Sequence, residues 1–243
     1  MTVELRFLGT GSASTPGGRG HTCIAVSDGT TTLLLDCGAT ALPAIVRAID
    51  PATIDGVVVT HLHGDHFAGI PFLLMHQAFA KRTRELVIAG PPSVEARLRE
   101  LSVALYRDYY KDPFPYPLRV VPFGSAEIAI GGARIAARPV AHSANAEPFG
   151  VRVALGGKTI AYTGDAEWSD ALPPLADGAD LLISEATTYA MRWKGHLAAT
   201  DLVAHRAELR TPRIVLMHLG PEMVAPHEAL PFEIPSDGDA IRL

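Results

Sequence analysis

The chain has 243 residues, of which 48% are hydrophobic and 19% are charged. This composition excludes a disordered or fibrous chain and predicts a folded protein with a sizeable core. The 26 acidic residues outnumber the 21 basic ones, and the formal net charge of -5 argues against a surface built to hold long nucleic acid. The ten histidines of this weakly acidic chain are the feature that needs an explanation.

The cellular setting is predicted from what the sequence lacks. Its two cysteines, Cys23 and Cys37, are too few for a secreted domain held together by disulfides. Residues 1–8 contain no basic leader followed by a long apolar run, and no stretch approaches the ~20 apolar residues of a membrane span. We therefore expect a cytoplasmic protein without a membrane segment. Because no linker interrupts the chain, we expect one domain over residues 1–243.

The first half of the chain alternates short strands with helices. The predicted strands are apolar or alternating runs bounded by turn residues, over 3–8, 23–26, 31–35, 56–60 and 87–89. The predicted helices have apolar residues at helical spacing and cover 41–49, 66–80 and 93–106. Ser93 is the expected N-cap of the last helix.

The second half begins with a proline-rich aromatic loop over 107–117 and is then dominated by strands. The predicted strands are 119–122, 127–130, 133–140, 150–155, 159–163, 180–184 and 214–217. One helix is predicted over 200–209. So many short strands, with helices between them, favour two sheets packed face to face with helices outside over one parallel sheet.

The strongest chemical signal is the run His-Leu-His-Gly-Asp-His at 61–66, directly after the strand 56–60. Side chains of an extended segment repeat with period two, so His61 and His63 point to the same side and can reach one cation. Asp65 and His66 turn into the next helix and can face a second cation. Imidazole nitrogen and carboxylate oxygen are ligands that zinc accepts, so the motif predicts a metal centre.

More ligands are expected at the ends of later strands, because four ligands do not complete two metal sites. Three candidates stand just past an apolar strand: His142, Asp165 and His218. Each alone is typical of an ordinary surface or core polar residue. Their repeated position after a strand favours a shared site.

The combination of His-x-His-x-Asp-His, a later His, a Gly-Asp and a final His resembles the metallo-β-lactamase fold of dinuclear metal hydrolases, over nearly the whole chain. The resemblance implies an α+β protein, an αββα sandwich of two mixed sheets with helices on the outer faces and the metals at one edge. It implies two ligand sets bridged by Asp165: His61, His63 and His142 for one metal, and Asp65, His66 and His218 for the other. The expected cofactor is two divalent metal ions, Zn2+ by ligand type, with Mn2+ or Fe as alternatives.

Further segments are similar to the transfer-RNA 3′-processing endonuclease branch of that superfamily, ribonuclease Z. They are Phe-Leu-Gly-Thr-Gly-Ser at 7–12, Leu-Leu-Asp-Cys-Gly at 34–38, Gly-Ile-Pro at 69–71, Ala-Gly-Pro at 89–91 and Ser-Glu-Ala-Thr at 184–187. In that branch a Glu and a His form a pair near the leaving group. The matching residues here are Glu185 and His196, and this pair points to phosphodiesters.

The charge of such a centre suits a phosphodiester. Two divalent cations, less the charges of Asp65, Asp165 and a bridging hydroxide, leave about one positive charge for a phosphodiester monoanion. The hydroxide would attack in line, with Asp65 orienting it or taking its proton. His196, held by Glu185, would stabilise the transition state or protonate the departing oxygen.

The chain departs from ribonuclease Z in one respect. That branch often carries a basic, glycine-rich arm between the third metal motif and the bridging Asp, whereas only 22 residues separate His142 from Asp165. We therefore predict a phosphodiesterase for a small or short substrate, such as a cyclic nucleotide or a nucleic-acid end, with an RNA 3′ end as a possible partner. The alternatives are a transfer-RNA 3′-processing endoribonuclease without the arm, a hydrolase of lactones, esters or thioesters, and a non-catalytic metal-binding relative.

The aromatic segment 106–116 leaves two interpretations open. Its five aromatic residues and cationic neighbours would suit a lid on which a base stacks. The segment would equally suit a proline-stiffened loop that packs on the domain or on a second subunit of a homodimer.

Overall fold

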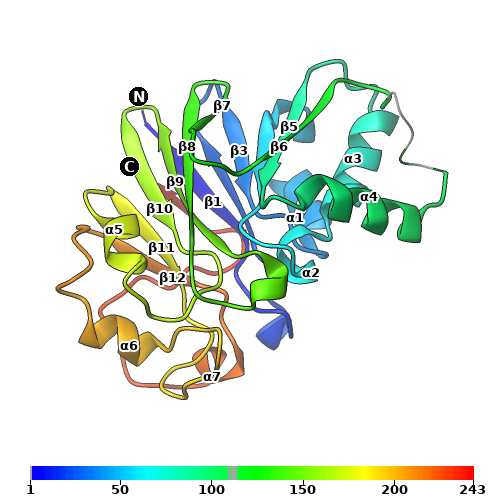
Figure 1. Ribbon diagram of the computed structural model, residues 1–243. Coiled ribbons are helices and arrows are strands. Elements are labelled where there is room, and N and C mark those ends of the chain that lie inside the picture. The colour runs from blue at the N-terminus through cyan, green and yellow to red at the C-terminus, as the bar shows by residue number, and fades with distance from the viewer. Residues whose placement is uncertain (1, 109, 111–113) are drawn as a thin grey trace.

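Two β-sheets packed face to face form the centre of this computed structural model, which describes residues 2–108, 110 and 114–243 (Figure 1). Within those residues the larger sheet has seven strands, in the order β13 (Ala240–Arg242), β1 (Glu4–Gly9), β2 (Cys23–Ser27), β3 (Thr32–Leu35), β4 (Gly56–Val58), β5 (Leu86–Gly90) and β6 (Leu118–Pro122). The described strands of the smaller sheet follow the order β12 (Ile214–Met217), β11 (Leu181–Glu185), β10 (Lys158–Tyr162), β9 (Phe149–Leu155), β8 (Ala133–Pro139) and β7 (Ile128–Ile130).

Helices cover the outer face of each sheet. Those against the larger sheet are α1 (Ala41–Ala48), α3 (Ile70–Phe79) and α4 (Val94–Leu105), and those of the smaller sheet are α5 (Leu172–Ala176) and α6 (Ala199–Ala204) (Figure 1). Shorter turns of helix are α2 (Gly64–Phe67), α7 (Pro221–Val224) and the 3₁₀ segments Pro16–Gly18, Pro51–Thr53 and Ala144–Ala146. The predicted sandwich of two mixed sheets with helices outside is confirmed.

The core lies in three layers that follow from the alternation of side chains along the strands. Alternate residues such as Leu5, Val26 and Val153 meet between the two sheets. The opposite faces of the strands pack under the helices, as Leu34 does beneath α1 and α3, and Leu182 on the other side. Because the central strands are buried on both faces, they are nearly continuous apolar runs in the sequence.

Strand direction is what brings distant residues together. In the larger sheet β3, β4, β5 and β6 are parallel neighbours. In the smaller sheet β10, β11 and β12 are parallel, and β8 has the same direction because both β8 and β10 are antiparallel to β9. The carboxyl ends of these strands therefore collect at a single edge within each sheet, where loops are free to carry functional residues.

The predicted helix over 66–80 is two helices, α2 and α3. Pro71 lies in the first turn of α3, where its missing N–H costs nothing, so it starts a new helix instead of continuing the old one. Gly69 stands at the break, and a Cβ there would lie only 2.2 Å from the carbonyl oxygen of Gly38. The break thus lets the segment after His66 pass close to the loop that follows β3.

Two other expectations need correction, and three observed elements were not predicted. The Ser93 side chain makes no capping hydrogen bond; its backbone N–H donates instead to Glu147 Oε2 at 3.0 Å. The helix expected over 200–209 ends at Ala204, and the Arg206 guanidinium then binds the carbonyl oxygen of Leu209, closing a turn. The elements α5, α7 and β13 are too short, or in α5 too rich in proline, for the pattern to indicate them.

Gly69→Ala is expected to destabilise the fold by about 1–3 kcal/mol, because the methyl group would overlap backbone atoms that cannot rotate away. Urea denaturation measures this free energy of unfolding. Gly64→Ala is the matched control, since a Cβ there has Ala68 at 3.7 Å as its nearest neighbour. Equal unfolding midpoints for the two variants would contradict the close approach.

Candidate metal centre

Seven of the nine sequence-predicted site residues come together at the edge where the strands end. They lie in two groups whose ligand atoms are within 4.8 Å of one another and which share Asp165. The first group is His61, His63, His142 and Asp165, and the second is Asp65, His66, Asp165 and His218. This is the division that the resemblance implied.

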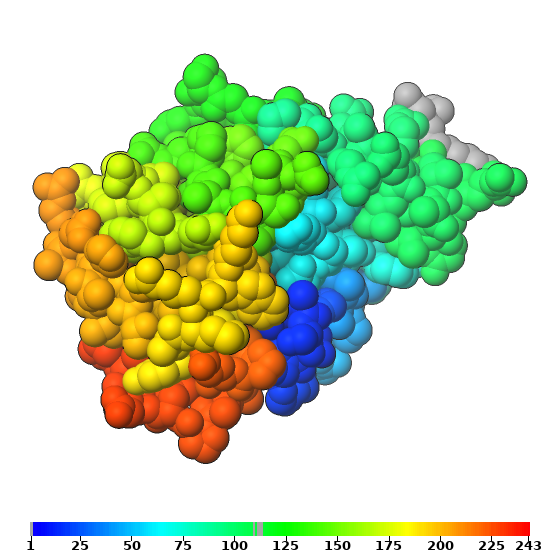
Figure 2. Space-filling view, turned by 60° about the horizontal axis from the view of Figure 1, so that its bottom comes forward, coloured from blue at the N-terminus to red at the C-terminus, as the bar shows by residue number. Residues whose placement is uncertain are grey.

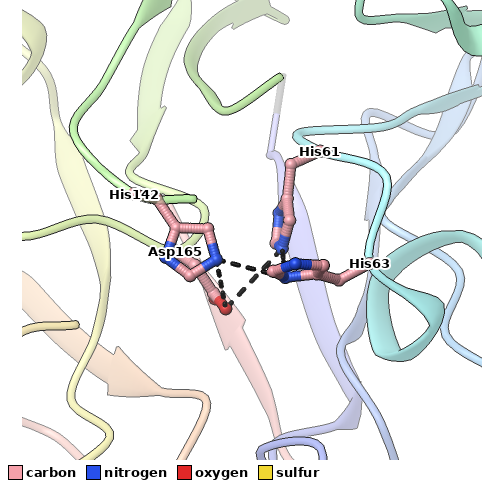
Figure 3. Close-up of side chains that lie close together, drawn as sticks. All are labelled: His61, His63, His142 and Asp165. Atoms are coloured by element: carbon pink, nitrogen blue, oxygen red, sulfur yellow. Dashed lines mark hydrogen bonds and ion pairs between the residues drawn. The ribbon is translucent and has the colours of Figure 1, made fainter. Parts of the chain in front are cut away.

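In the first group three imidazole nitrogens point at one another (Figure 3). His63 Nδ1 lies 3.1 Å from both His61 Nε2 and His142 Nε2. Asp165 Oδ2 is 3.7 Å from His61 Nε2 and 3.9 Å from His142 Nε2. Four donor atoms from three separate loops therefore converge on one point, as tetrahedral coordination requires.

The second group is deeper. Asp165 Oδ1 lies 3.2 Å from His66 Nε2, and Asp165 Oδ2 lies 3.3 Å from His218 Nε2. Asp65 Oδ2 lies 3.2 Å from His218 Nε2 and 3.6 Å from His66 Nε2. Both imidazoles and Asp165 are almost fully buried.

The donor set fits a pair of divalent cations. His66 Nε2 and Asp165 Oδ1 are buried and have no hydrogen-bond partner, which is costly unless a ligand completes them. The donors are imidazole nitrogen and carboxylate oxygen, which zinc, manganese and iron all accept. Asp165 belongs to both groups and is therefore placed to bridge two ions.

Hydrogen bonds to the far nitrogens fix how the imidazoles face. His66 Nδ1–H donates to Asp36 Oδ2 at 2.8 Å. Thr60 Oγ1 donates to the same carboxylate and lies 3.2 Å from His61 Nδ1. His142 Nδ1–H donates to the carbonyl oxygen of Gly195 at 2.6 Å. In each case Nε2 is left facing the centre, which is how proteins orient metal-binding histidines.

Asp36 is the residue that the sequence analysis did not assign. It follows β3, is fully buried, and also accepts hydrogen bonds from the Thr60 backbone N–H and the Tyr162 hydroxyl. Its φ of 57° is a left-handed conformation that a residue other than glycine rarely adopts, and His218 has a similar φ of 55°. Such strain is typical of positions that the surrounding structure holds for a function. The available sequence signal was the position of Asp36 in the segment 34–38, which is similar to ribonuclease Z.

Charge and burial set the protonation of the cluster. Burial lowers the pKa of His61 and His63, which keeps their imidazoles in the neutral form that binds metal. Burial would raise the pKa of Asp165, but the neighbouring histidines His218, His66 and His61 hold it well below the usual range of a carboxyl group. Burial opposes protonation of His66, yet the carboxylates of Asp165 and Asp36 raise its pKa well above normal. Metal binding would therefore displace a proton from His66.

The Glu185–His196 pair lies beside this centre. His196 Nδ1–H donates to Glu185 Oε1 at 3.1 Å and lies 3.8 Å from Asp165 Oδ2. Burial lowers the pKa of His196, but the hydrogen bond to Glu185 and the charge of Glu185 outweigh burial and raise it to about 9. Thr187 Oγ1 donates to Glu185 Oε2 and lies 2.9 Å from His218 Nδ1, which ties the pair to the second ligand group.

The described part of the aromatic segment 106–116 packs on the protein. Tyr116 is buried, and its hydroxyl donates to the carbonyl oxygen of Leu74 at 3.2 Å. Phe114 and Tyr110 pack against the same core, and Arg99 lies over the Tyr110 ring. Of the two interpretations, packing on the domain is the one these contacts fit. Tyr109 and Lys111, which belong to the lid hypothesis, lie outside the described residues.

Asp36→Asn is expected to weaken metal binding about 10-fold to 100-fold without removing a ligand, because the carboxylate orients His66 and, through Thr60, His61. Titration of the metal-free protein with Zn2+ measures the affinity. Tyr162→Phe removes one donor to the same carboxylate and serves as the milder control. An unchanged affinity in Asp36→Asn would contradict the orienting role.

Comparison with known proteins agrees with this geometry. The sequence model of a family described as the β-lactamase superfamily domain matches residues 31–219. A ribonuclease Z from Methanothermobacter thermautotrophicus is 27% identical, over 89% of this chain and 86% of the relative. Two solved structures share the fold: a diphosphatase from the PhnP family (TM-score 0.79, 20% identity, 100% and 98% of the two chains) and human tRNase Z, short form (0.76, 23%, 98% of each). Among the described helices, none combines the length and apolar character needed to cross a bilayer.

Proposed function

The chain belongs to the metallo-β-lactamase superfamily of hydrolases, and we propose that it is a phosphodiesterase acting on a small or short phosphodiester, a cyclic nucleotide or a nucleic-acid end. The observation that carries the proposal is the Glu185–His196 pair, hydrogen-bonded and adjacent to Asp165. A departing alkoxide needs a proton, and His196 is placed to give one. The similarity to ribonuclease Z favours a phosphodiester over a lactone or thioester as the substrate of this pair.

In this proposal the two ligand groups hold two divalent cations. His61, His63 and His142 would hold the first, and the second would be held by Asp65, His66 and His218, with Asp165 between them. The cations, when bound, would supply Lewis acidity: a lower pKa for bound water and positive charge for the phosphate oxygens. Zn2+ is the ion that the ligand set suits best.

The chain's own groups then account for substrate handling. One carboxylate oxygen of Asp65 faces His218 and His66. Burial would raise the pKa of Asp65, but the hydrogen bond from His218 outweighs burial and holds that pKa well below normal, so the carboxylate is ionised. It is thus placed to orient the attacking water or accept its proton. His196 carries a proton at neutral pH and can give it to the leaving oxygen. Glu185 keeps that imidazole in place and compensates its charge.

A second candidate is the transfer-RNA 3′-processing reaction. The observation in its favour is the similarity to ribonuclease Z over nine-tenths of this chain. Against it stands the short connection between His142 and Asp165, which forms the 3₁₀ segment Ala144–Ala146, β9, β10 and their turns and leaves no length for an arm. Substrate size separates the two candidates.

His196→Ala is expected to lower kcat for bis(p-nitrophenyl) phosphate by about 100-fold or more while leaving bound metal unchanged, because its Nδ1 faces Glu185 and its loss removes the proton donor. Metal content is measured by mass spectrometry on the same preparation. Asp165→Asn is the comparison variant and should lose metal as well as activity. Glu185, His196 and His218 also form a compact group, so equal loss of metal from His196→Ala would make His196 a ligand and refute the assignment.

Cyclic nucleotides are expected to be hydrolysed faster than precursor transfer RNA, and the RNA reaction should weaken steeply as salt increases. A protein with a formal charge of -5 and no arm gathers a long polyanion poorly. The measurement is kcat/KM for both substrates between low and physiological ionic strength. Efficient transfer-RNA cleavage that resists salt would favour the second candidate, and turnover of a lactone or thioester alone would refute both.

A further inference from the structure

A tryptophan stands exposed beside the Glu185–His196 pair. Trp193 keeps 54% of its surface accessible, and its ring centroid lies 5.6 Å from that of His196. It belongs to the loop 188–196 between β11 and α6. Figure 2 shows gold-coloured atoms, from the chain around residue 190, projecting beside the cyan part of the chain that includes the His-x-His-x-Asp-His motif. Neither the metal ligands nor the proposed proton donor accounts for this indole.

The loop is held at both ends. Glu222 Oε2 accepts hydrogen bonds from the backbone N–H groups of Tyr189 and Ala190, at 2.7 and 3.3 Å. At the other end the Gly195 N–H donates to Glu167 Oε1 at 2.7 Å, while the Gly195 carbonyl accepts from His142. A large apolar side chain is thus kept in contact with water at a fixed place next to the centre.

The position of Trp193 beside His196 determines which part of a bound substrate the indole can contact. His196 lies beside the centre, with Nδ1 3.8 Å from Asp165 Oδ2, and as the proposed proton donor it would place the leaving group on its own side of a bound phosphate. The His196 N–H donates to the Trp193 carbonyl at 3.0 Å, which joins the two residues in one tight turn. The indole therefore lies within a nucleoside's reach of the scissile bond.

We propose that Trp193 stacks on the base of the departing nucleoside, so that the substrate is a nucleotide phosphodiester and not a base-free one. The inference rests on the proposed phosphodiesterase function. The indole offers a flat apolar face, and base stacking on such a face is sequence-tolerant. The neighbouring cations Arg192 and Lys194 favour an anionic ligand, although Arg192 also lies 3.5 Å from Asp201.

Fluorescence tests the stacking apart from catalysis. The chain has two tryptophans, and Trp168 packs away from the centre on His205, with ring centroids 4.0 Å apart. In the Trp168→Phe variant, Trp193 is the sole indole reporter. Adenosine is expected to quench its emission saturably and ribose to leave it unchanged. Equal responses to adenosine and ribose would overturn the proposal.

Kinetics test the same contact in catalysis. The substrates are the dinucleotide ApA and its analogue with an abasic ribose in place of the departing adenosine. Trp193→Ala should raise KM for ApA about tenfold and leave KM for the abasic analogue within twofold of the wild-type value. Trp193→Phe keeps an aromatic face and should return KM for ApA most of the way to the wild-type value. Met191→Ala is the matched control, since Met191 is equally exposed on the same loop.

The outcomes separate the two proposals. If Trp193→Ala lowers kcat/KM equally for ApA and the abasic analogue, the indole merely supports His196 and the stacking proposal is overturned. If the metal-loaded wild-type protein cleaves no phosphodiester while adenosine still quenches Trp193, the proposed function fails and the nucleobase site stands.

Discussion

The candidate site depends on one constraint, the shared direction of the strands whose carboxyl ends meet at the same edge. Asp36 follows β3 and His61 follows β4, both in the larger sheet, whereas the other ligand-bearing loops follow β8, β10 and β12 in the smaller. None of these residues is close to all the others in sequence. They meet because parallel neighbours end at the same edge and the two sheets share one apolar core. The ligands are thereby carried on the segments that directly follow strands, with Asp65 and His66 in the short helix α2.

That arrangement places strongly polar groups where burial is expensive. The network through Asp36 limits the cost, because its buried carboxylate accepts hydrogen bonds from His66, Thr60 and Tyr162. Two of the buried atoms without a hydrogen-bond partner, His66 Nε2 and Asp165 Oδ1, face the point where the cations would lie. Stability and function are coupled here, because the same cations that would serve the reaction would also relieve the polar atoms that the fold leaves without partners.

The sequence was most informative where chemistry and strand pattern coincided. The run at 61–66 and the polar residues after β8, β10 and β12 predicted which residues meet, because His or Asp recurred directly after strands and that repetition favours a shared site. The role of Asp36 was not predicted, because it depends on hydrogen bonds from Thr60, Tyr162 and His66 that only the tertiary structure shows. The break between α2 and α3 was not predicted either, because helical periodicity continues across it and the cause, contact with Gly38, is tertiary.

Net charge and local charge have different consequences for substrate choice. A formal net charge of -5 attracts a long polyanion weakly. In the proposed reaction, however, the phosphate would bind at the ligand cluster, where the local field would depend on the cations and on His196. With weak long-range attraction, affinity must come from contacts within a nucleoside's length of the scissile bond. An indole on a loop fixed by Glu222, Glu167 and His142 is suited to that task, because stacking depends little on ionic strength whereas an arm of basic residues would depend on it strongly.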